Sequence, residues 1–398
     1  MAMRDTDVEI RGDSLAKKRI LLGVSGGIAA VDTVRLAREL RRHGAVVSVM
    51  MTHSAQKIIS PLAIEWATQS PVITDWESDL TALEEVDGIL IAPTTRDLMA
   101  SYLHGLQHGP ILMALSAART RDCPVMMIPS MHADLANDPV TQELVDEVRH
   151  KGIKVHWGEE VEGKRKTPPH QEIVARFANY VNFRKGNRKS VVVTLGATCS
   201  PIDDIRFIQN TSSGSTGFAI ADDLFRHGHD VTCVTGITTV ATPNWLPLII
   251  PAESPSEMLK ELFALTNDNI QAWVHSAAVL DYVVETSAEG KLASQQGPLT
   301  VKLIESPKHI LELTKKCQGS VRIGFKLETG IKQKELVRRA LAQIEYANMT
   351  AVVANRLEDI NDSSKPRAYL VDRTGSDFML PTIGDMCTAV RTLIERGN

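Results

Sequence analysis

Val191–Gly217, VVVTLGATCSPIDDIRFIQNTSSGSTG, is the stretch that decides the fold. Its first residues, VVVT, are apolar or β-branched, which predicts a buried parallel strand. A small-residue turn, Gly196-Ala197-Thr198, follows, and a second small-residue loop at Asn210–Gly217 runs into an expected helix at Phe218–His227. Such loops at a helix N-terminus offer free N–H groups to an anion. The pattern predicts a nucleotide or phosphorylated substrate held between the two loops, although a pair of ordinary strand-to-helix turns would look the same.

The rest of the second half repeats this alternation of short strands and helices. The segment Ile360–Arg367, INDSSKPR, is expected to be a mobile loop, and a helix closes the chain. Apolar runs predict the further strands Asp230–Val234, Ala272–His275, Val321–Phe325, Ala351–Ala354 and, as the last, Ala368–Val371, and Asp377–Leu380 precedes the terminal helix.

The first half has the same organisation. Strands are expected at Arg19–Val24, Ala45–Met51, Val86–Ala92 and Pro124–Ile128, with a helix at Ile28–His43. This alternation predicts a parallel, doubly wound α/β sheet, whose ligands lie at the carboxyl ends of the strands. The loops at those ends are rich in Ser, Thr, Gly and Pro: Ser25-Gly26-Gly27, Thr52-His53-Ser54, Pro93-Thr94-Thr95 and Pro129-Ser130-Met131-His132.

A basic, polar break at Phe183–Lys189 separates the halves and places the domains at residues 1–186 and 187–398. The halves share no repeat period, so we expect two different α/β domains. The composition limits the classes of function. The chain has 398 residues, of which 43% are hydrophobic and 23% charged, as in a globular protein. Its net charge of −4 argues against general nucleic-acid binding. Without a membrane span, a signal peptide or a C-x-x-C pair among its five cysteines, the chain is expected in the reducing cytoplasm.

Read in order, the motifs resemble one family, the bifunctional phosphopantothenoylcysteine decarboxylase/phosphopantothenate–cysteine ligases of coenzyme A biosynthesis. No single motif is specific, but their ordered combination is, and the resemblance covers about residues 17–395. The motifs are VSGGIAA at 24–30, IAPTT at 91–95, PSMH at 129–132, DDIRFIQNTSSG at 203–214, AAVLDY at 277–282 and GFKLET at 324–329.

For the first half, the resemblance implies a flavodoxin-like, FMN-binding domain that oxidatively decarboxylates a cysteinyl carboxylate. The first small-residue turn and the helix after it suit a phosphate, and the threonines of the neighbouring strand ends suit the flavin or its phosphate. The residues expected to bind FMN are Ser25, Gly26, Gly27, Ile28, Thr52, Ser54, Pro93, Thr94, Thr95 and Met131.

This half also departs from the family pattern. Asp79 stands where members usually carry a catalytic His, and a carboxylate with a reference pKa of ~3.9 would repel the carboxylate to be lost. His132 replaces an Asn found in many bacterial members, and the loop at 158–166 lacks the usual Cys. The last two departures resemble the archaeal branch of the family. His132 is the candidate to supply the missing imidazole, because His is the usual acid or base near neutrality.

For the second half, the resemblance implies a Rossmann-like ligase domain that activates 4′-phosphopantothenate as an acyl-nucleotide, with CTP as the usual nucleotide and Mg²⁺ bridging its phosphates. Asn210 matches the residue that stabilises the acyl-cytidylate, a sensible task for an amide donor. Ser215-Thr216 stands where many members have a Lys. The residues expected at the nucleotide are Gly196, Asp281, Lys291, Pro307, Lys308, His309, Ile310, Phe325 and Arg339.

Three interpretations follow from these residues. The first is an enzyme that makes 4′-phosphopantetheine from phosphopantothenate, CTP and cysteine. The second keeps the ligase but treats the first domain as an inactive flavin-binding scaffold. The third is a flavodoxin-like regulatory binding protein, which is disfavoured because the ligase motifs are present in order. The choice between CTP and ATP stays open, no metal ligand is assigned, and the family implies a homo-oligomer, up to a dodecamer.

Overall fold

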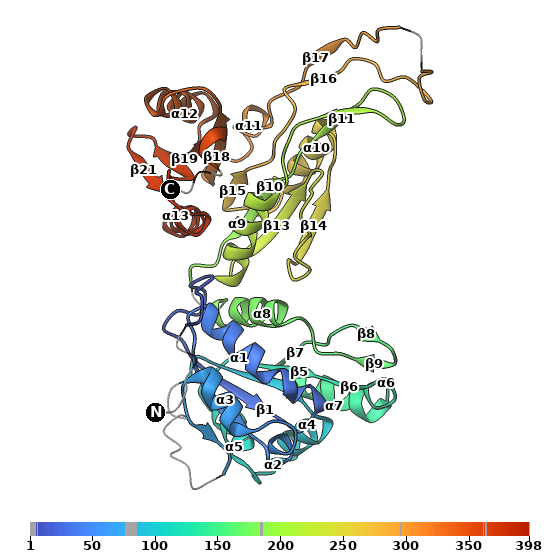
Figure 1. Cartoon of the computed structure of the whole chain (residues 1–398), viewed down its shortest axis with the longest axis vertical. Helices are drawn as coiled ribbons and strands as arrows, with labels where there is room; N and C mark the ends of the chain where they lie inside the picture. Colours follow the sequence, from blue (N-terminus) through green and yellow to red (C-terminus); the bar gives the residue numbers. More distant parts are fainter. Residues whose placement is uncertain are drawn as a thin grey trace. The chain divides into compact units, whose positions relative to one another are not determined.

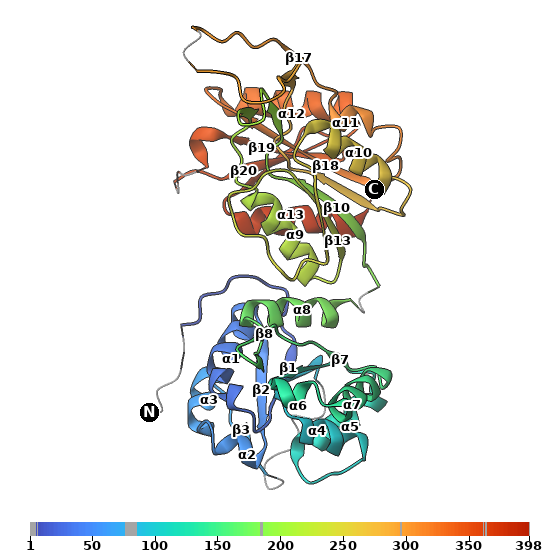
Figure 2. The same cartoon turned by 90° about the vertical axis from the view of Figure 1, so that its right-hand side faces the viewer.

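The computed structural model of the chain describes residues 5, 7–75, 86–183, 186–294, 297–360, 362 and 364–397. It divides into two compact units, Met1–Arg184 and Lys185–Asn398, and each has its own sheet and its own apolar cores (Figures 1 and 2). None of the helices in these ranges has the length and apolarity needed to span a bilayer. The α/β class expected for both halves is confirmed.

Unit 1 is built on a six-stranded sheet in the order β3-β2-β1-β4-β5-β7, with every neighbouring pair parallel. The strand order is that of the classic doubly wound sheet, and it reverses direction between β1 and β4. The strands are β1 (Arg19–Val24), β2 (Val46–Met51), β3 (Val72–Ile73), β4 (Gly88–Thr94), β5 (Val125–Pro129) and β7 (Lys154–Val155). The four strands expected from the sequence of this half are confirmed.

Helices cover both faces of this sheet and bury its apolar side chains. One core joins α1, α3 and α8 to the sheet, and the other joins α4, α5 and α7. The expected helix at 28–43 begins as a 3₁₀ turn before it becomes α1. The helices are η1 (Ile28–Asp32), α1 (Thr33–Arg42), α2 (His53–Gln56), α3 (Pro61–Thr68), α4 (Arg96–Leu103), α5 (Pro110–Thr120), α6 (Ala133–Ala136), α7 (Pro139–His150) and α8 (His170–Asn182).

A small antiparallel sheet accompanies the carboxyl edge of unit 1. It has the order β6-β9-β8, from β6 (Met131–His132), β8 (Glu160–Val161) and β9 (Lys164–Arg165). Register pairs Met131 with Arg165 and His132 with Lys164. The hairpin of β8 and β9 lies in the loop at 158–166 that lacks the usual Cys, and it pairs with β6 in the segment that follows β5 (Figure 1).

Unit 2 has an eight-stranded sheet in the order β14-β13-β10-β15-β18-β19-β20-β21, parallel as far as β19 and antiparallel beyond it. All six strands expected from the sequence are present in it, and β14 and β21 were not expected. The strands are β10 (Ser190–Leu195), β13 (Asp230–Thr235), β14 (Leu248–Pro251), β15 (Ala272–His275), β18 (Val321–Glu328), β19 (Ala351–Arg356), β20 (Ala368–Asp372) and β21 (Asp377–Leu380).

Two layers of helices enclose this sheet (Figure 2). Apolar side chains of α10 (Pro255–Leu265), α11 (His309–Glu312) and α12 (Gln333–Ala347) pack on one face. The other face carries α9 (Ser215–Arg226) and α13 (Ile383–Arg396). Two short antiparallel pairs extend from this body: β11 (Cys199–Pro201) with β12 (Phe207–Gln209), and β16 (Tyr282–Val284) with β17 (Leu303–Glu305).

Candidate active sites

Ser25 joins two loops at the point where the strand order of unit 1 reverses. Its hydroxyl donates to the carbonyl oxygen of Pro93 over 2.8 Å and accepts from the amide of Thr95 over 2.9 Å. The side chain is buried. Ser25 therefore holds the loops after β1 and β4 together, and its hydroxyl is occupied by protein partners.

Gly26 and Gly27 allow four strand-end loops to meet at this edge. A Cβ on Gly26 would collide with the side chain of Ser54, which follows β2. A Cβ on Gly27 would lie 3.5 Å from Pro93 Cγ and 3.7 Å from the carbonyl oxygen of Ser130, which follow β4 and β5. The loops converge at the switch point of the sheet, where doubly wound sheets bind cofactors in a crevice.

The three threonines expected at the flavin all use their hydroxyls within the protein. Thr52 and Thr95 cap the helices that follow them, since Thr52 Oγ1 accepts from the amide of Ala55 over 3.2 Å and Thr95 Oγ1 accepts from Leu98 over 3.3 Å. Thr94 is fully buried and donates to the carbonyl oxygen of Ile91 over 2.9 Å. These threonines therefore hold the loops in shape and cap the helices that follow them.

Met131 and His132 continue the edge of this crevice. Met131 packs against the apolar core, and His132 is exposed at the start of α6. His132 lies two residues beyond Ser130, whose carbonyl oxygen faces Gly27, and its backbone pairs with the β8–β9 hairpin. Ile28, which begins η1, is 77% exposed. Asp79 falls outside the described residues.

Unit 2 contains a cavity of about 510 Å³ at the carboxyl ends of β10, β15 and β18. Its lining comes from segments that lie more than a hundred residues apart in the sequence. The polar and glycine residues in its lining include Thr194, Gly196, Thr211–Gly217, His275, Ser276, Asp281, Lys308, His309, Lys326, Gln343, Asn355 and Arg367.

Seven of the nine residues expected at the nucleotide line this cavity: Gly196, Asp281, Pro307, Lys308, His309, Ile310 and Phe325. Lys291 and Arg339 are not in its lining. Lys291 is exposed in the segment between β16 and β17, and Arg339 is held on α12 by Glu328 at 2.6 Å and Glu335 at 2.9 Å. Asn210 lies at the border, where its Nδ2 donates to the carbonyl oxygen of Ala278, a lining residue, over 3.2 Å.

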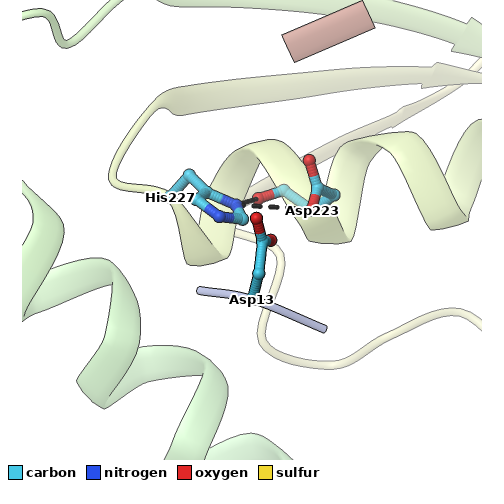
Figure 3. A group of neighbouring side chains, drawn as sticks. All are labelled: Asp13, Asp223 and His227. Atoms are coloured by element: carbon cyan, nitrogen blue, oxygen red, sulfur yellow. Dashed lines mark hydrogen bonds and ion pairs between the residues drawn. The ribbon is translucent and has the colours of Figure 1, made fainter. Parts of the chain in front are cut away.

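The N-terminus of α9 opens into the cavity. Gly214 adopts a left-handed φ of 79° before the first turn. Gly217 has no room for a side chain, because a Cβ there would collide with Leu195 and lie 2.8 Å from Ser276 Oγ. At its other end the helix is anchored: His227 Nδ1 lies 3.3 Å from Asp223 Oδ1 (Figure 3), and Arg391 of α13 donates to Asp223 over 3.0 Å. The fold therefore fixes the start of α9 at the carboxyl edge of the sheet.

Two buried histidines line the cavity as neutral imidazoles. Burial, with the nearby charge of Arg322 and with His309, lowers the pKa of His275 to about 3. Burial also lowers the pKa of His309. His275 stacks on Trp273 with ring centroids 6.5 Å apart, and neither His275 Nε2 nor His309 Nδ1 has a hydrogen-bond partner in the described chain. Neither ring therefore adds positive charge to the cavity.

Sequence reasoning missed several residues of this cavity. Lys326 and Asn355 lie toward the carboxyl ends of β18 and β19, so the predicted sheet topology carried a signal for both. Arg367 precedes the antiparallel strand β20, and no local pattern marks it. Metal ligands stay unassigned: within either unit taken alone, the described residues bring no three histidine, cysteine or carboxylate side chains together at metal-binding spacing.

Comparison with known proteins gives the relatives of both units. The flavoprotein family model matches residues 9–182, and the model of the DNA/pantothenate metabolism flavoprotein C-terminal domain matches residues 186–393. The chain is 35% identical to the coenzyme A biosynthesis bifunctional protein CoaBC of Thermococcus kodakarensis over 368 residues, which cover 90% of each chain. It is 31% identical to the protein of the same name from Methanocaldococcus jannaschii, over 86% of this chain and 84% of the relative.

Among solved structures, the DNA/pantothenate metabolism flavoprotein from Streptococcus pneumoniae is 22% identical, with a TM-score of 0.48 over 52% of this chain and 99% of that one. The two family models together span both units, and the relatives match across the boundary between them. The chain therefore belongs to the family of bifunctional coenzyme A biosynthesis proteins, in which a flavoprotein decarboxylase of phosphopantothenoylcysteine precedes a phosphopantothenate–cysteine ligase.

Proposed function

We propose that unit 2 joins cysteine to 4′-phosphopantothenate with CTP. The substrate carboxylate attacks the α-phosphorus and releases pyrophosphate, and the cysteine amine then displaces CMP from the acyl-cytidylate and loses a proton. The observation that carries this proposal is the cavity at the strand ends, where the loop before α9, the Ala277–Asp281 segment and the Pro307–Ile310 segment meet. A helix start beside small hydroxyl residues suits phosphates.

Asn210 is proposed to stabilise the acyl-cytidylate through its amide N–H groups. Its Nδ2 donates to the backbone of the Ala277–Asp281 segment, so an N–H donor of the kind that stabilises an oxyanion lies at the border of the cavity. Asp281 and Lys308 form an exposed ion pair at 3.7 Å, which leaves both side chains accessible to the nucleotide. Mg²⁺ is proposed to bind through the phosphates of CTP.

Unit 1 is proposed to bind FMN in the crevice formed by the loops after β1, β2, β4 and β5, and to decarboxylate the phosphopantothenoylcysteine made by unit 2. When bound there, FMN would take two electrons from the substrate to make loss of CO₂ possible and would return them to the decarboxylated product, so that the overall reaction needs no other oxidant. His132 is proposed as the proton-transferring residue, because it is exposed beside this crevice and its backbone pairs with the β8–β9 hairpin. The enzyme is proposed to work in the cytoplasm as a homo-oligomer.

A coupled assay tests both halves. The purified chain is incubated with Mg²⁺, phosphopantothenate, cysteine and either CTP or ATP, and the carboxylated and decarboxylated products are separated by mass. Pyrophosphate release with CTP supports the ligase. Pyrophosphate release with ATP but not with CTP would make ATP the nucleotide substrate.

A yellow protein that releases CO₂ from phosphopantothenoylcysteine supports the decarboxylase. A yellow protein that makes phosphopantothenoylcysteine but releases no CO₂ would make unit 1 a flavin-binding scaffold, the alternative that the missing histidine favours. His132→Ala is expected to lose CO₂ release, and His150→Ala, at the exposed end of α7, is the control.

A further inference from the structure

Many members of the family have a lysine where this chain has Ser215-Thr216, and Arg367 places a cation beside that position. We propose that its guanidinium binds a phosphate group of a substrate in the cavity of unit 2; the inference rests on the ligase function proposed above. Arg367 Nη2 donates to Thr216 Oγ1 over 3.3 Å, and both residues line the cavity although 151 positions separate them. Thr216 lies in the first turn of α9.

The charges of the cavity single out this side chain. Its lining contains three lysines and arginines, namely Lys308, Lys326 and Arg367. Lys308 lies 3.7 Å from Asp281, and Lys326 lies 3.2 Å from Glu328. Arg367 has no carboxylate partner among the residues that the structure describes, and its side-chain hydrogen bond there goes to a neutral hydroxyl. A half-buried arginine without a carboxylate is ready to accept a phosphate, which matches its planar fork of donors.

The start of α9 supplies the matching backbone groups. The amides of Thr216 and Gly217 have no acceptor among the described residues, and the first turn contains no acidic side chain. Gly217 packs directly on Leu195 and Ser276, so these amides lie at the carboxyl edge of the sheet, where the cavity is. Two free N–H groups, the positive end of the helix dipole and an uncompensated guanidinium therefore converge on one point.

Arg339 is the arginine that the sequence favours for the triphosphate, but it contacts Glu328 and Glu335 and lies outside the lining of the cavity. Arg367 takes that task in our proposal. The phosphate it holds belongs either to the nucleotide or to the 4′-phosphate of phosphopantothenate, and the two sources differ in which ligand loses affinity when Arg367 is changed.

The experiment is calorimetric titration of the full-length protein with three probes: CTP with Mg²⁺, inorganic pyrophosphate, and 4′-phosphopantothenate. Arg367→Gln is expected to weaken one class of probe about 10- to 100-fold, as loss of a charge-assisted hydrogen bond predicts. Arg367→Lys keeps the charge and is expected to restore most of that affinity. Arg373→Gln is the matched control, because Arg373 lies just beyond the other end of β20 and is exposed.

Weaker binding of CTP and pyrophosphate assigns Arg367 to the nucleotide, and weaker binding of phosphopantothenate alone assigns it to the 4′-phosphate. Unchanged affinity for all three probes would overturn the proposal. So would a Lys variant that binds as weakly as the Gln variant and melts at an equally reduced temperature, because Arg367 would then only hold its loop on α9. If the wild-type protein binds pyrophosphate but no nucleotide, the proposed ligase function is wrong. The role of Arg367 is then still tested by the affinity of its variants for pyrophosphate.

Discussion

At the scale of single residues, Asn210 is the most direct test of the ligase chemistry. Asn210→Asp keeps the shape of the side chain but replaces its N–H donors with a charge that faces the carbonyl oxygen of Ala278. Loss of one oxyanion donor costs about 10²–10³ in kcat, and we expect pyrophosphate release to fall by at least that factor. Gln209→Glu makes the same change of charge one residue earlier and is the control. Equal activity of the two variants would remove Asn210 from the mechanism.

His275 predicts how the stability of unit 2 depends on pH. Its pKa is about 3 in the folded protein, against an ordinary value of about 6.5 when unfolded, so the unfolded chain binds the extra proton between these values. Stability is therefore complete above pH 6.5 and falls as the pH decreases, with about 2 kcal/mol lost by pH 5. Urea unfolding at pH 7.5 and pH 5 measures this loss.

His275→Gln is expected to remove that part of the pH dependence, while the exposed His150→Gln leaves it in place. The stability of the His275→Gln variant will still depend on pH, because burial lowers the pKa of His309 as well. An identical loss of stability in wild type and His275→Gln would show that His275 does not titrate in this way.

At the scale of elements, the close approach of α9 to the sheet can be tested with two glycines. Gly217→Ala forces a methyl group onto Leu195 and Ser276, and overpacking of this kind costs about 1–3 kcal/mol. We expect a lower melting temperature and weaker nucleotide binding, since the helix start must move. Gly384→Ala is the control: it lies in α13, its nearest contact is Thr382 Oγ1 at 3.6 Å, and a helical alanine there stabilises by about 0.5–1 kcal/mol. Two variants that melt alike would contradict the packing argument.

The elements also show what the sequence could predict. Buried strands carry unbroken apolar runs, and for that reason β1 and β15 have the bounds expected for them. The antiparallel pairs β11–β12 and β16–β17 have strands of three residues each, too short for any periodicity, and depend on pairing between distant segments.

The residues of the candidate sites also divide into those that the sequence could predict and those that it could not. Residues in a loop that directly follows a predicted parallel strand, such as Gly196 and Asp281, reach the cavity because topology puts them there. Arg339 does not, because carboxylates on its own helix and on β18 hold it. Arg367 does, because β20 turns antiparallel and brings its preceding loop back to the edge. Side-chain pairing and strand reversal leave no local signature in sequence.

At the scale of the whole molecule, the division into two compact units predicts that ligation and decarboxylation can be separated. Each unit has apolar cores of its own, and the residues brought together at each candidate site come from one unit. We therefore expect residues 1–184 and 185–398, expressed separately, to fold. The first fragment is expected to be yellow and to release CO₂ from phosphopantothenoylcysteine, and the second to release pyrophosphate with CTP, phosphopantothenate and cysteine.

Mixing the two fragments should restore the full conversion, because the product of one is the substrate of the other and can diffuse between them. The intact chain at equal concentration is the control, and a faster coupled rate in it would measure what the covalent link contributes. A soluble fragment that is inactive while the intact chain is active would show that its site needs the other unit, against the independence that the separate cores imply.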